Sequence, residues 1–372
     1  MSVRIITPVQ ILEAHQHGIW ALCLSADHHL ISGGGDGLLK LWKFDVQTEK
    51  LVLVSSASTP HTEILVVQKT KYGKLVSAGH HGGICVWNID HEKGLLRLHQ
   101  NLGIETEYWE YNDRILETQT GHLITWIYLG ALPPIVWEWS NEEGAYRLKH
   151  ELPMNHVSVL VEDLYGNLFS GDRDGKITWW WKDITMHFWT AGQTLQAHKG
   201  AVRAMTRTRE GYLLSGGDDC LIKYWQPNMD FKSLVLMDIL EGHASPIFHI
   251  METKSGEIVS NDHGVRILAF RYPRKPEFRV WRKKPGGIRF VQNQMGFVRG
   301  YLPPDLLIID EMEGNLTLWK RQEENYVRYA VMKNGHRDLI VCCEVLSDGY
   351  LATGGLDGRL VLWDIRPFLA KE

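Results

Sequence analysis

Residues 351–364 read Leu-Ala-Thr-Gly-Gly-Leu-Asp-Gly-Arg-Leu-Val-Leu-Trp-Asp, and this stretch decides the fold. Its Asp-Gly dipeptide supplies the positive φ angle that a tight hairpin needs, and an apolar run ending in Trp363 follows the dipeptide. His336 precedes Thr353 by 17 residues, and Trp363 follows Thr353 by 10 residues. The stretch predicts two antiparallel strands joined by a tight turn, within a unit that begins near the histidine.

The same spacing recurs along the chain. Both intervals occur again in two segments, and the first interval occurs once more without the tryptophan: His15 with Ser32 and Trp42, His198 with Ser215 and Trp225, and His243 with Ser260. Two looser copies follow the same plan: His61 with Ser77 and Trp87, and His156 with Ser170 and Trp180. Self-similarity at a nearly fixed period indicates a repeat architecture, and each unit is expected to form a small sheet of four strands.

These units resemble the repeats of WD40-repeat β-propellers. The resemblance rests on Glu-Gly-His243, Asn-Gly-His336, the Ser-Gly-Gly turns and Trp363-Asp364, and it extends over essentially the whole chain. It implies an all-β ring of four-stranded blades that serves as an interaction platform, without implying a particular activity. We therefore expect a single propeller domain over residues 1–372.

The number of units predicts the number of blades. The hydroxyl position of the repeat, or its equivalent, falls at Ser32, Ser77, Glu117, Ser170, Ser215, Ser260, Ile309 and Thr353. Eight units predict eight blades, or seven if one of the two degenerate units, the third and the sixth, is an insertion. In the third unit, Thr125-Trp126 is taken as the end of the third strand. Because residues 9–15 match the outer strands that precede later blades, we expect the N-terminal strand to complete the last blade and close the ring.

The repeated polar residues have the composition of a hydrolase triad. An enzyme needs one such triad, whereas this set recurs with the same spacing, so a structural hydrogen-bond network is the better interpretation. Its expected members are His15, Ser32, Asp36, Trp42, His198, Ser215, Asp219, Trp225, His336, Thr353, Asp357 and Trp363. We therefore predict no catalytic activity. The chain has no Cys/His ligand spacing and no Gly-Lys-Ser/Thr loop, so neither a metal nor a cofactor is expected.

Composition restricts the compartment and the class of partner. The 40 Lys and Arg residues against 44 Asp and Glu residues give a net charge of −4, which provides no global attraction to nucleic acid or anionic membranes. The five cysteines form no CxxC motif, and no apolar run is long enough to cross a membrane. We expect an intracellular protein, cytoplasmic or nuclear or both, without membrane insertion.

Specificity is expected where the sequence departs from the repeat. Three insertions, 129–144, 182–192 and 270–290, are expected after third strands, at one end of the ring. The first two bring aromatic residues to adjacent blades, where they either cover the rims of their own blades or form an exposed docking patch. These residues are Trp137, Trp139, Phe188 and Trp189.

The third insertion is strongly basic. It holds eight Lys or Arg residues and one Glu, with aromatic residues interleaved. This composition suits RNA or single-stranded DNA, suits an acidic protein segment or a lipid headgroup almost as well, and is also typical of a solvated charged loop. The expected contact residues are Arg274, Lys275, Arg279, Trp281, Arg282, Lys283 and Lys284.

The opposite end of the ring is where peptides commonly dock in WD40 relatives, over the central channel. By position, the residues expected at this entrance are Trp20, His80, Arg173, Arg203, Asp218 and Phe248. A mixture of arginine, aspartate and aromatic residues suits the recognition of a short peptide, although any solvent-facing loop can contain it.

One further resemblance concerns the last unit. Residues 351–366 are similar to the DWD box of substrate receptors of cullin-4 ubiquitin ligases, which implies an adaptor contact at Asp364 and Arg366; Trp-Asp-x-Arg also arises by drift in unrelated propellers. The preferred function is a non-catalytic scaffold or adaptor that docks protein partners in a multi-subunit complex. An RNA-binding or ribonucleoprotein subunit that uses 270–290, and a ligase substrate receptor, are the alternatives. The sequence leaves homo-oligomerisation open.

Overall fold

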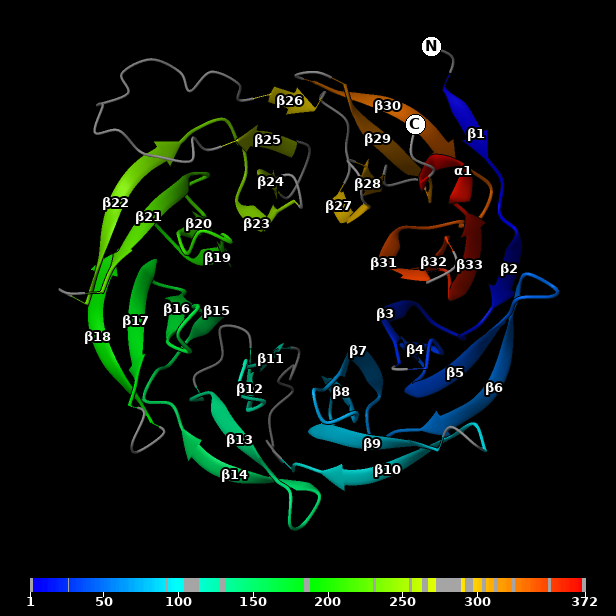
Figure 1. The fold of residues 1–372 in the computed structure, drawn as a ribbon, viewed down its shortest axis with the longest axis horizontal. Coiled ribbons are helices and arrows are strands. Elements are labelled where there is room, and N and C mark those ends of the chain that lie inside the picture. The colour runs from blue at the N-terminus through cyan, green and yellow to red at the C-terminus, as the bar shows by residue number, and fades with distance from the viewer. Residues whose placement is uncertain are drawn as a thin grey trace.

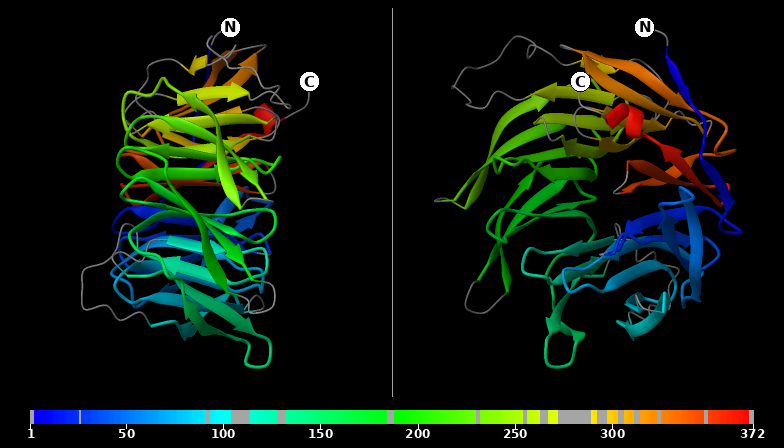
Figure 2. Two further views of the ribbon diagram at one scale, coloured as in Figure 1. Left: turned by 90° about the vertical axis from the view of Figure 1, so that its left-hand side faces the viewer. Right: turned by 45° about the vertical axis from the view of Figure 1, so that its right-hand side comes forward.

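The strands form sheets that stand around one axis. The computed structural model describes residues 3–25, 27–90, 93–103, 114–127, 132–183, 188–229, 232–253, 256–262, 267–271, 289–291, 297–302, 306–310, 314–322, 325–346 and 349–369. Within these residues there are eight sheets, arranged as a ring (Figure 1), and the ring is flattened along its axis (Figure 2). The predicted fold class, an all-β WD40-type propeller, is confirmed.

Each of the first four blades is a meander of four consecutive antiparallel strands, counted from the axis outward. Blade 1 contains β3 (Ile19–Leu24), β4 (Leu30–Gly34), β5 (Leu38–Asp45) and β6 (Lys50–Ser58). Blade 2 contains β7 (Glu63–Lys69), β8 (Leu75–His80), β9 (Ile84–Asp90) and β10 (Leu95–Asn101). Blade 3 contains β11 (Arg114–Glu117), β12 (Leu123–Trp126), β13 (Ile135–Ser140) and β14 (Ala145–Glu151). Blade 4 contains β15 (Val157–Glu162), β16 (Leu168–Asp172), β17 (Lys176–Lys182) and β18 (Trp189–Gln196).

The remaining blades follow the same plan, with N-terminal strands added to the last two. Blade 5 contains β19 (Val202–Arg207), β20 (Leu213–Gly217), β21 (Ile222–Asn228) and β22 (Ser233–Leu240). Blade 6 contains β23 (Ile247–Glu252), β24 (Glu257–Asp262), β25 (Ile267–Arg271) and β26 (Arg289–Val291). Blade 7 contains β27 (Phe297–Leu302), β28 (Leu306–Asp310), β29 (Leu316–Gln322) and β30 (Asn325–Met332), with β1 (Arg4–Ile6) outside β30. Blade 8 contains β31 (Ile340–Leu346), β32 (Tyr350–Gly355), β33 (Arg359–Asp364) and β2 (Gln10–Glu13), and α1 (Arg366–Leu369) follows it.

The second strands are buried on both faces because neighbouring blades pack against each of them. Every residue of β4 is buried, so the alternation of a half-exposed strand is absent. A Cβ atom at Gly33 would lie 2.6 Å from Cγ2 of Ile64 in blade 2, so glycine is required for the blades to approach this closely. Ile31 and Leu39 of blade 1 share a core cluster with Ile64 and Leu75 of blade 2. The hydrophobic core therefore lies between blades, and each blade stabilises its neighbours.

The N-terminal segment joins two blades at the end of the chain. Strand β2 pairs antiparallel with β33, with Glu13 opposite Arg359, as the sequence predicted for this strand. Strand β1 pairs parallel with β30 in blade 7, which the sequence analysis did not anticipate. Ile6 at the end of β1 enters the core cluster that contains Leu318 and Met332. The first strands of the chain thus fasten blade 7 to blade 8 (Figure 1).

The prediction for the third unit was wrong in its register. The structure places Trp126 at the end of the second strand, β12, and not at the end of the third strand. The hydroxyl of this blade is Thr125, which accepts a hydrogen bond of 3.0 Å from Nε1 of Trp137, so Glu117 is not its equivalent. The connection from β12 to β13 is longer than the usual tight turn, which lengthens the hydroxyl-to-tryptophan interval. Insertion 129–144 accordingly contains β13 itself and does not follow a third strand.

The described residues contain very little helix. The one helix described, α1, has four residues, and none of the described helical structure is long and apolar enough to span a bilayer.

Candidate functional site

The predicted polar network is present inside blade 1. Nε1 of Trp42 donates to Oγ of Ser32 at 2.9 Å, and Oγ of Ser32 lies 2.8 Å from Nε2 of His15. Nδ1 of His15 lies 2.8 Å from Oδ1 of Asp36. Because an indole only donates and a carboxylate only accepts, the chain of donors runs from Trp42 through Ser32 and His15 to Asp36.

Blades 5 and 8 contain the same network. His198 lies 2.7 Å from Oγ of Ser215 and 2.8 Å from Asp219, and Trp225 donates to Ser215. His336 lies 2.8 Å from Oγ1 of Thr353, Asp357 holds the other ring nitrogen at 3.0 Å, and Trp363 donates to Thr353.

The two looser copies, in blades 2 and 4, lack the hydrogen bond from the histidine to a turn aspartate. In blade 2, Nδ1 of His61 lies 2.8 Å from the backbone carbonyl of His81, which takes the place of the missing turn aspartate. In blade 4, Trp180 donates to Ser170 at 2.8 Å, but Nδ1 of His156 is buried without a hydrogen-bond partner. The indole–hydroxyl contact is therefore the more persistent half of the network.

Burial sets the charge state of the network. Burial lowers the pKa of His15 and of His198, although the carboxylate beside each histidine raises it. Burial raises the pKa of Asp36 and of Asp219, but hydrogen bonds from the histidines and from backbone N–H groups outweigh it, so the pKa of each carboxyl lies below its usual value. At neutral pH the histidines are neutral and the aspartates are ionised. The hydroxyls of Ser32, Ser215 and Thr353 belong to residues with 0% exposure, so a substrate has no access to them.

Three of the predicted entrance residues come together between blades 5 and 6. Nε and Nη2 of Arg203 donate to the two carboxylate oxygens of Asp218 at 2.7 and 3.3 Å. The same guanidinium lies over the ring of Phe248, 5.4 Å from its centroid, and Phe248 is 41% exposed. We call Arg203, Asp218 and Phe248 the entrance cluster. Arg203 and Phe248 are the second residues of the inner strands β19 and β23, which face the axis of the ring (Figure 1).

Local structure fixes the orientation of the aspartate in this cluster. Oδ2 of Asp218 accepts the backbone N–H of Ala201 at 2.9 Å, and the backbone N–H of Asp218 donates to the carbonyl of Ala201 at 3.0 Å. Gly200 has a φ angle of +95°, and a Cβ atom there would lie 2.8 Å from Cβ of Asp218. The loop before β19 is thus shaped around Asp218, which holds Arg203 in place.

The other three entrance residues lie apart from this cluster. Trp20 is the second residue of β3 in blade 1, and a Cβ atom at Gly35 would lie 3.2 Å from its Nε1. Nδ1 of His80 lies 3.4 Å from Oε2 of Glu63 in blade 2. Arg173 is exposed in blade 4, with its Nε 4.0 Å from Oδ1 of Asp174. Their role at the entrance stays a prediction, and the pairing of Arg203 with Asp218 was not foreseen from the sequence.

The expectation of an exposed aromatic patch is not supported for two of its residues. Trp137 is 7% exposed and Trp189 is 3% exposed. They also belong to different core clusters: Trp137 packs with Val76 of blade 2, whereas Trp189 packs with Trp126 and Trp180. The reason is that Trp137 is the strand tryptophan of blade 3, so it lies in the inter-blade core. These two indoles do not form a common surface.

The other two aromatic residues of the insertions are more accessible. Trp139 stacks on Tyr72 with a centroid distance of 5.0 Å and contacts Tyr146 edge-on. Phe188 is 44% exposed, and its ring lies 4.7 Å from that of His150. Phe188 is the residue of this set that a partner could reach most easily.

The basic insertion and the Asp364–Arg366 pair are the two remaining predicted sites. The basic residues of 270–290, from Arg274 to Lys284, lie outside the described residues, so the RNA-binding alternative stays a prediction. Arg366 is described: its guanidinium donates to Asp364 at 2.9 and 2.7 Å and to Glu49 at 3.0 Å, and it lies 4.6 Å from the ring centroid of Tyr350. An adaptor contact through Arg366 would have to compete with these interactions.

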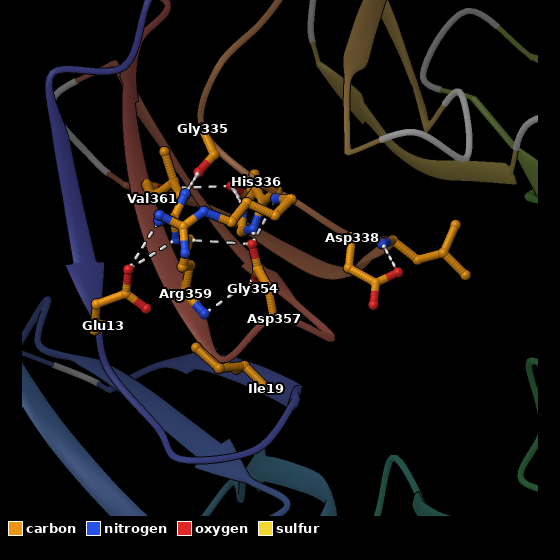
Figure 3. Close-up of polar contacts among 12 residues, drawn as sticks. Glu13, Ile19, Gly335, His336, Asp338, Gly354, Asp357, Arg359 and Val361 are labelled. Atoms are coloured by element: carbon orange, nitrogen blue, oxygen red, sulfur yellow. Dashed lines mark hydrogen bonds and ion pairs between the residues drawn. The ribbon is translucent and has the colours of Figure 1, made fainter.

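The N-terminal strand meets the last blade at a buried arginine (Figure 3). Nε and Nη2 of Arg359 donate to Oε1 of Glu13 at 3.0 and 2.9 Å, and Nη1 donates to the carbonyl of Gly335 at 3.1 Å. Arg359 also lies 3.9 Å from the carboxylate of Asp357, a member of the blade 8 network. The N-terminal strand is therefore bound to the same polar centre that organises the last blade.

A second inter-blade contact was not recognised in the sequence. Gln10 of blade 8 bonds both the N–H and the C=O of Leu51 in blade 1, at 2.7 and 3.1 Å. Gln100 forms the same pair of bonds with Tyr146, and Gln193 accepts from the N–H of Leu234. Gln10 and Gln193 each stand five residues before the network histidine, so the repeat spacing could have revealed two of the three.

Metal binding receives no support from the geometry. Across the described part of the chain, no group of three or more His, Cys, Asp or Glu side chains is placed to hold a metal ion.

Comparisons with known proteins agree with this architecture. A sequence profile described as "WD domain, G-beta repeat" matches residues 6–43, 189–226 and 329–364, the three segments that contain the complete networks. Protein transport protein SEC13-2 of Candida glabrata is 26% identical over 113 residues, which are 29% of this chain and 37% of that protein. The match thus spans little more than a third of that relative.

Solved structures share the fold at low sequence identity. The C-terminal WD40 domain of Sif2 has a TM-score of 0.73 at 14% identity, covering 98% of this chain and 99% of that chain. Sqt1 of Saccharomyces cerevisiae has a TM-score of 0.71 at 13% identity, covering 98% and 100%. A chain of the mitotic checkpoint complex has a TM-score of 0.59 at 16% identity, covering 98% and 94%. At these identities the likeness shows the fold alone.

Proposed function

We propose that this chain, which a WD40-repeat model matches at three sites and which shares the fold of WD40 domains, is a non-catalytic scaffold that docks a segment of a partner protein at the entrance cluster. The proposal rests on the arrangement of Arg203, Asp218 and Phe248. The exposed ring of Phe248 lies beside the guanidinium of Arg203, which the carboxylate of Asp218 orients through two hydrogen bonds. Rigid aromatic and arginine side chains of this kind dominate the energetics of protein interfaces.

The geometry of the cluster favours a short protein segment as the ligand. Phe248 offers an apolar surface, and Asp218 and Arg203 offer a charge of each sign beside it, so a peptide can place an apolar side chain against the ring and a polar group against the pair. The side chains of Arg203 and Asp218 are only 23% and 29% exposed, so little side-chain freedom is lost when a ligand binds.

The buried networks support the non-catalytic part of the proposal. Each hydroxyl already accepts from an indole and bonds a histidine, and the blades repeat this arrangement as a structural element. A nucleophile must reach its substrate, whereas these hydroxyls lie in the inter-blade core. The recurrence and the burial together favour scaffolding.

The relatives fit a role within an assembly. One protein of similar fold was solved as part of the mitotic checkpoint complex, and the curated relative is named as a protein transport protein. We extend to this chain only what the first of these suggests, a place in an assembly of proteins. We place the protein inside the cell, where a reducing environment keeps cysteine thiols such as that of Cys85 from forming disulfides.

A peptide-display selection against the purified chain tests the proposal. The affinity of the selected peptides is then measured by calorimetry for the wild type, Phe248→Ala, Arg203→Ala and Asp218→Asn. Loss of a hot-spot side chain costs about 2 kcal/mol, so a decrease in affinity of about 30-fold is expected. Arg147→Ala, which alters an exposed pair with Glu143 on the rim of blade 3, is the matched control and should bind normally. Unchanged affinity in all three entrance variants would exclude this site.

A further inference from the structure

Exposed apolar side chains occur on or beside the outer strands of blades 8, 1 and 2. We call these residues of β6, β10 and the β2 segment the rim belt: Val9, Ile11, Val52, Leu53, Val54, Leu95 and Leu98. The three strands follow one another along the rim of the ring (Figure 1). Gln10 on β2 bonds Leu51 on β6, and a Cβ atom at Gly94 would lie 2.3 Å from Cγ1 of Val54. These contacts link the three outer strands along the rim.

The size of the belt distinguishes it from scattered surface residues. Val52 is 51% exposed and Leu53 is 47% exposed, so both faces of β6 are uncovered at this point. Seven such side chains amount to roughly 500 Å² of apolar surface, a patch size that is often functional in monomers. A standard interface buries about 800 Å² on each partner, most of which the belt and the adjoining backbone can supply.

The centre of the belt also lies on a sheet edge, along which Gln10 occupies the backbone N–H and C=O of Leu51. In the described sheet the strand order is β3-β4-β5-β6, so β6 is the terminal strand. Native proteins commonly protect such edges with charged side chains, yet no Lys, Arg, Asp or Glu occurs from residue 51 to residue 62. Strand β18 also lacks charge, but its exposed residues are small or polar, among them Thr190, Ala191 and Gly192. The outer edge of blade 7 is covered by β1, which shows that a fifth strand can be added to a blade of this ring.

The sequence of β6 is suited to pairing with itself. It reads Leu-Val-Leu-Val-Ser from Leu51 to Ser55. An antiparallel arrangement with its two-fold axis at Leu53 puts Leu53 opposite its own copy and Val52 opposite Val54, which is a favourable set of cross-strand pairs. Gln10 bonds the backbone of Leu51 from outside the sheet. Leu53 is two residues further along and precedes the register shift at Val54, so its N–H and C=O lie on the same side as those of Leu51.

We propose that this protein self-associates through the rim belt, with β6 of one copy pairing antiparallel with β6 of a second copy across a two-fold axis. Two convex rims can meet along such an edge without contact between the rest of the rings. The resulting sheet continues from blade 1 of one copy into blade 1 of the other. This surface is separate from the entrance cluster, so dimerisation leaves the proposed docking site accessible.

Sedimentation velocity over a range of protein concentrations tests the proposal. The wild type should shift from monomer to dimer as its concentration rises, and Leu53→Lys should remain monomeric because two ammonium groups would face each other across the axis. Val235→Lys is the matched control, since Val235 is an exposed residue of the outer strand β22, and it should dimerise as the wild type does. A wild type that is monomeric throughout overturns the proposal. A dimer that survives Leu53→Lys, or is lost in Val235→Lys, overturns it as well.

Hydrogen exchange of the wild-type protein provides a second readout that needs no variant. The backbone amide of Leu53 should exchange at least tenfold more slowly at high protein concentration than at low concentration, because the pairing protects it. The amides of β18 should exchange at the same rate under both conditions. If the exchange rate of the β6 amides does not depend on protein concentration, the edge is not paired and the proposal is wrong. This result does not depend on whether the Leu53→Lys variant folds.

Discussion

Arg359 and Glu13 are 346 positions apart in the sequence, yet the guanidinium of Arg359 donates two hydrogen bonds to one carboxylate oxygen of Glu13. The contact lies beside the register pair that joins β2 to β33. The arginine is buried, whereas Glu13 is exposed. The two sides of the contact should therefore differ in their importance for stability.

Replacing Arg359 should weaken ring closure more than replacing Glu13. Arg359→Ala removes the bonds to both Glu13 and the carbonyl of Gly335, and hydrogen bonds to charged groups contribute about 2 kcal/mol. Glu13→Gln changes one exposed partner and should cost about 0.5 kcal/mol. Urea unfolding measures both changes, with Arg147→Ala as a control for an exposed ion pair. Equal effects of Arg359→Ala and Arg147→Ala would contradict the proposed role in closure.

In the polar network, removal of the hydroxyl group should lower the free energy of unfolding more than removal of the methyl group next to it. Ser32→Ala leaves Nε2 of His15 and Nε1 of Trp42 buried without their partner, which should cost about 2 kcal/mol or more. Thr353→Ser in blade 8 keeps the hydroxyl and removes one methyl group, with an expected cost of about 1 kcal/mol. Unfolding midpoints in urea compare the two variants. A larger loss for Thr353→Ser than for Ser32→Ala would rule out the hydroxyl as the central member.

Two aromatic residues of the insertions should respond differently to truncation. Trp137 is a core residue of blade 3, so Trp137→Ala should destabilise the protein by about 3–5 kcal/mol. Phe188 is partly exposed, and Phe188→Ala should cost less than about 1 kcal/mol. Thermal unfolding followed by circular dichroism separates the two cases. Similar stability of the two variants would mean that Trp137 is not buried as described.

Acidification should destabilise the fold. The pKa of His15 and of His198 is lowered by burial, so between that lowered value and about 6.5 the unfolded chain binds more protons than the folded chain. Stability therefore falls as the pH decreases below about 6.5. Burial lowers the pKa of His122 to about 4, which acts in the same direction. The carboxyls of Asp36 and Asp219, with their lowered pKa values, add a further loss only below their usual range.

Unfolding in urea at several pH values between 8 and 5 measures this dependence. A His15→Gln variant, although less stable, should show a shallower slope because it has one fewer histidine that is neutral only when folded. A midpoint that stays constant over this range, or rises on acidification, is incompatible with the charge states assigned to the network.

The sequence predicted those features that repeat with a constant spacing. The network of His15, Ser32 and Trp42 could be predicted because three contacts of fixed geometry require fixed intervals. The hydroxyl and the tryptophan of blade 3 were predicted wrongly because the connection between its second and third strands is long. This connection separates Thr125 from Trp137 by 12 residues, so the pair does not match the 10-residue interval of the repeat. The periodicity indicates a blade but does not locate an insertion within it.

Contacts between blades were harder to foresee. Arg203 and Asp218 were both expected near the entrance, but their ion pair and the position of Phe248 depend on how neighbouring blades are turned relative to one another. The parallel pairing of β1 with β30 likewise has no signature in the local sequence, because three residues without a turn do not specify a partner strand.

The most direct test of the central claim measures binding and stability on the same two variants, Phe248→Ala and Ser32→Ala. The claim is that the repeated network supports the ring, whereas recognition belongs to the entrance cluster. Phe248→Ala should lose about 30-fold in peptide affinity while its unfolding midpoint stays near that of the wild type. Ser32→Ala should unfold at a lower urea concentration and bind the peptide normally while folded. Normal binding by Phe248→Ala, together with loss of binding by folded Ser32→Ala, would contradict the claim.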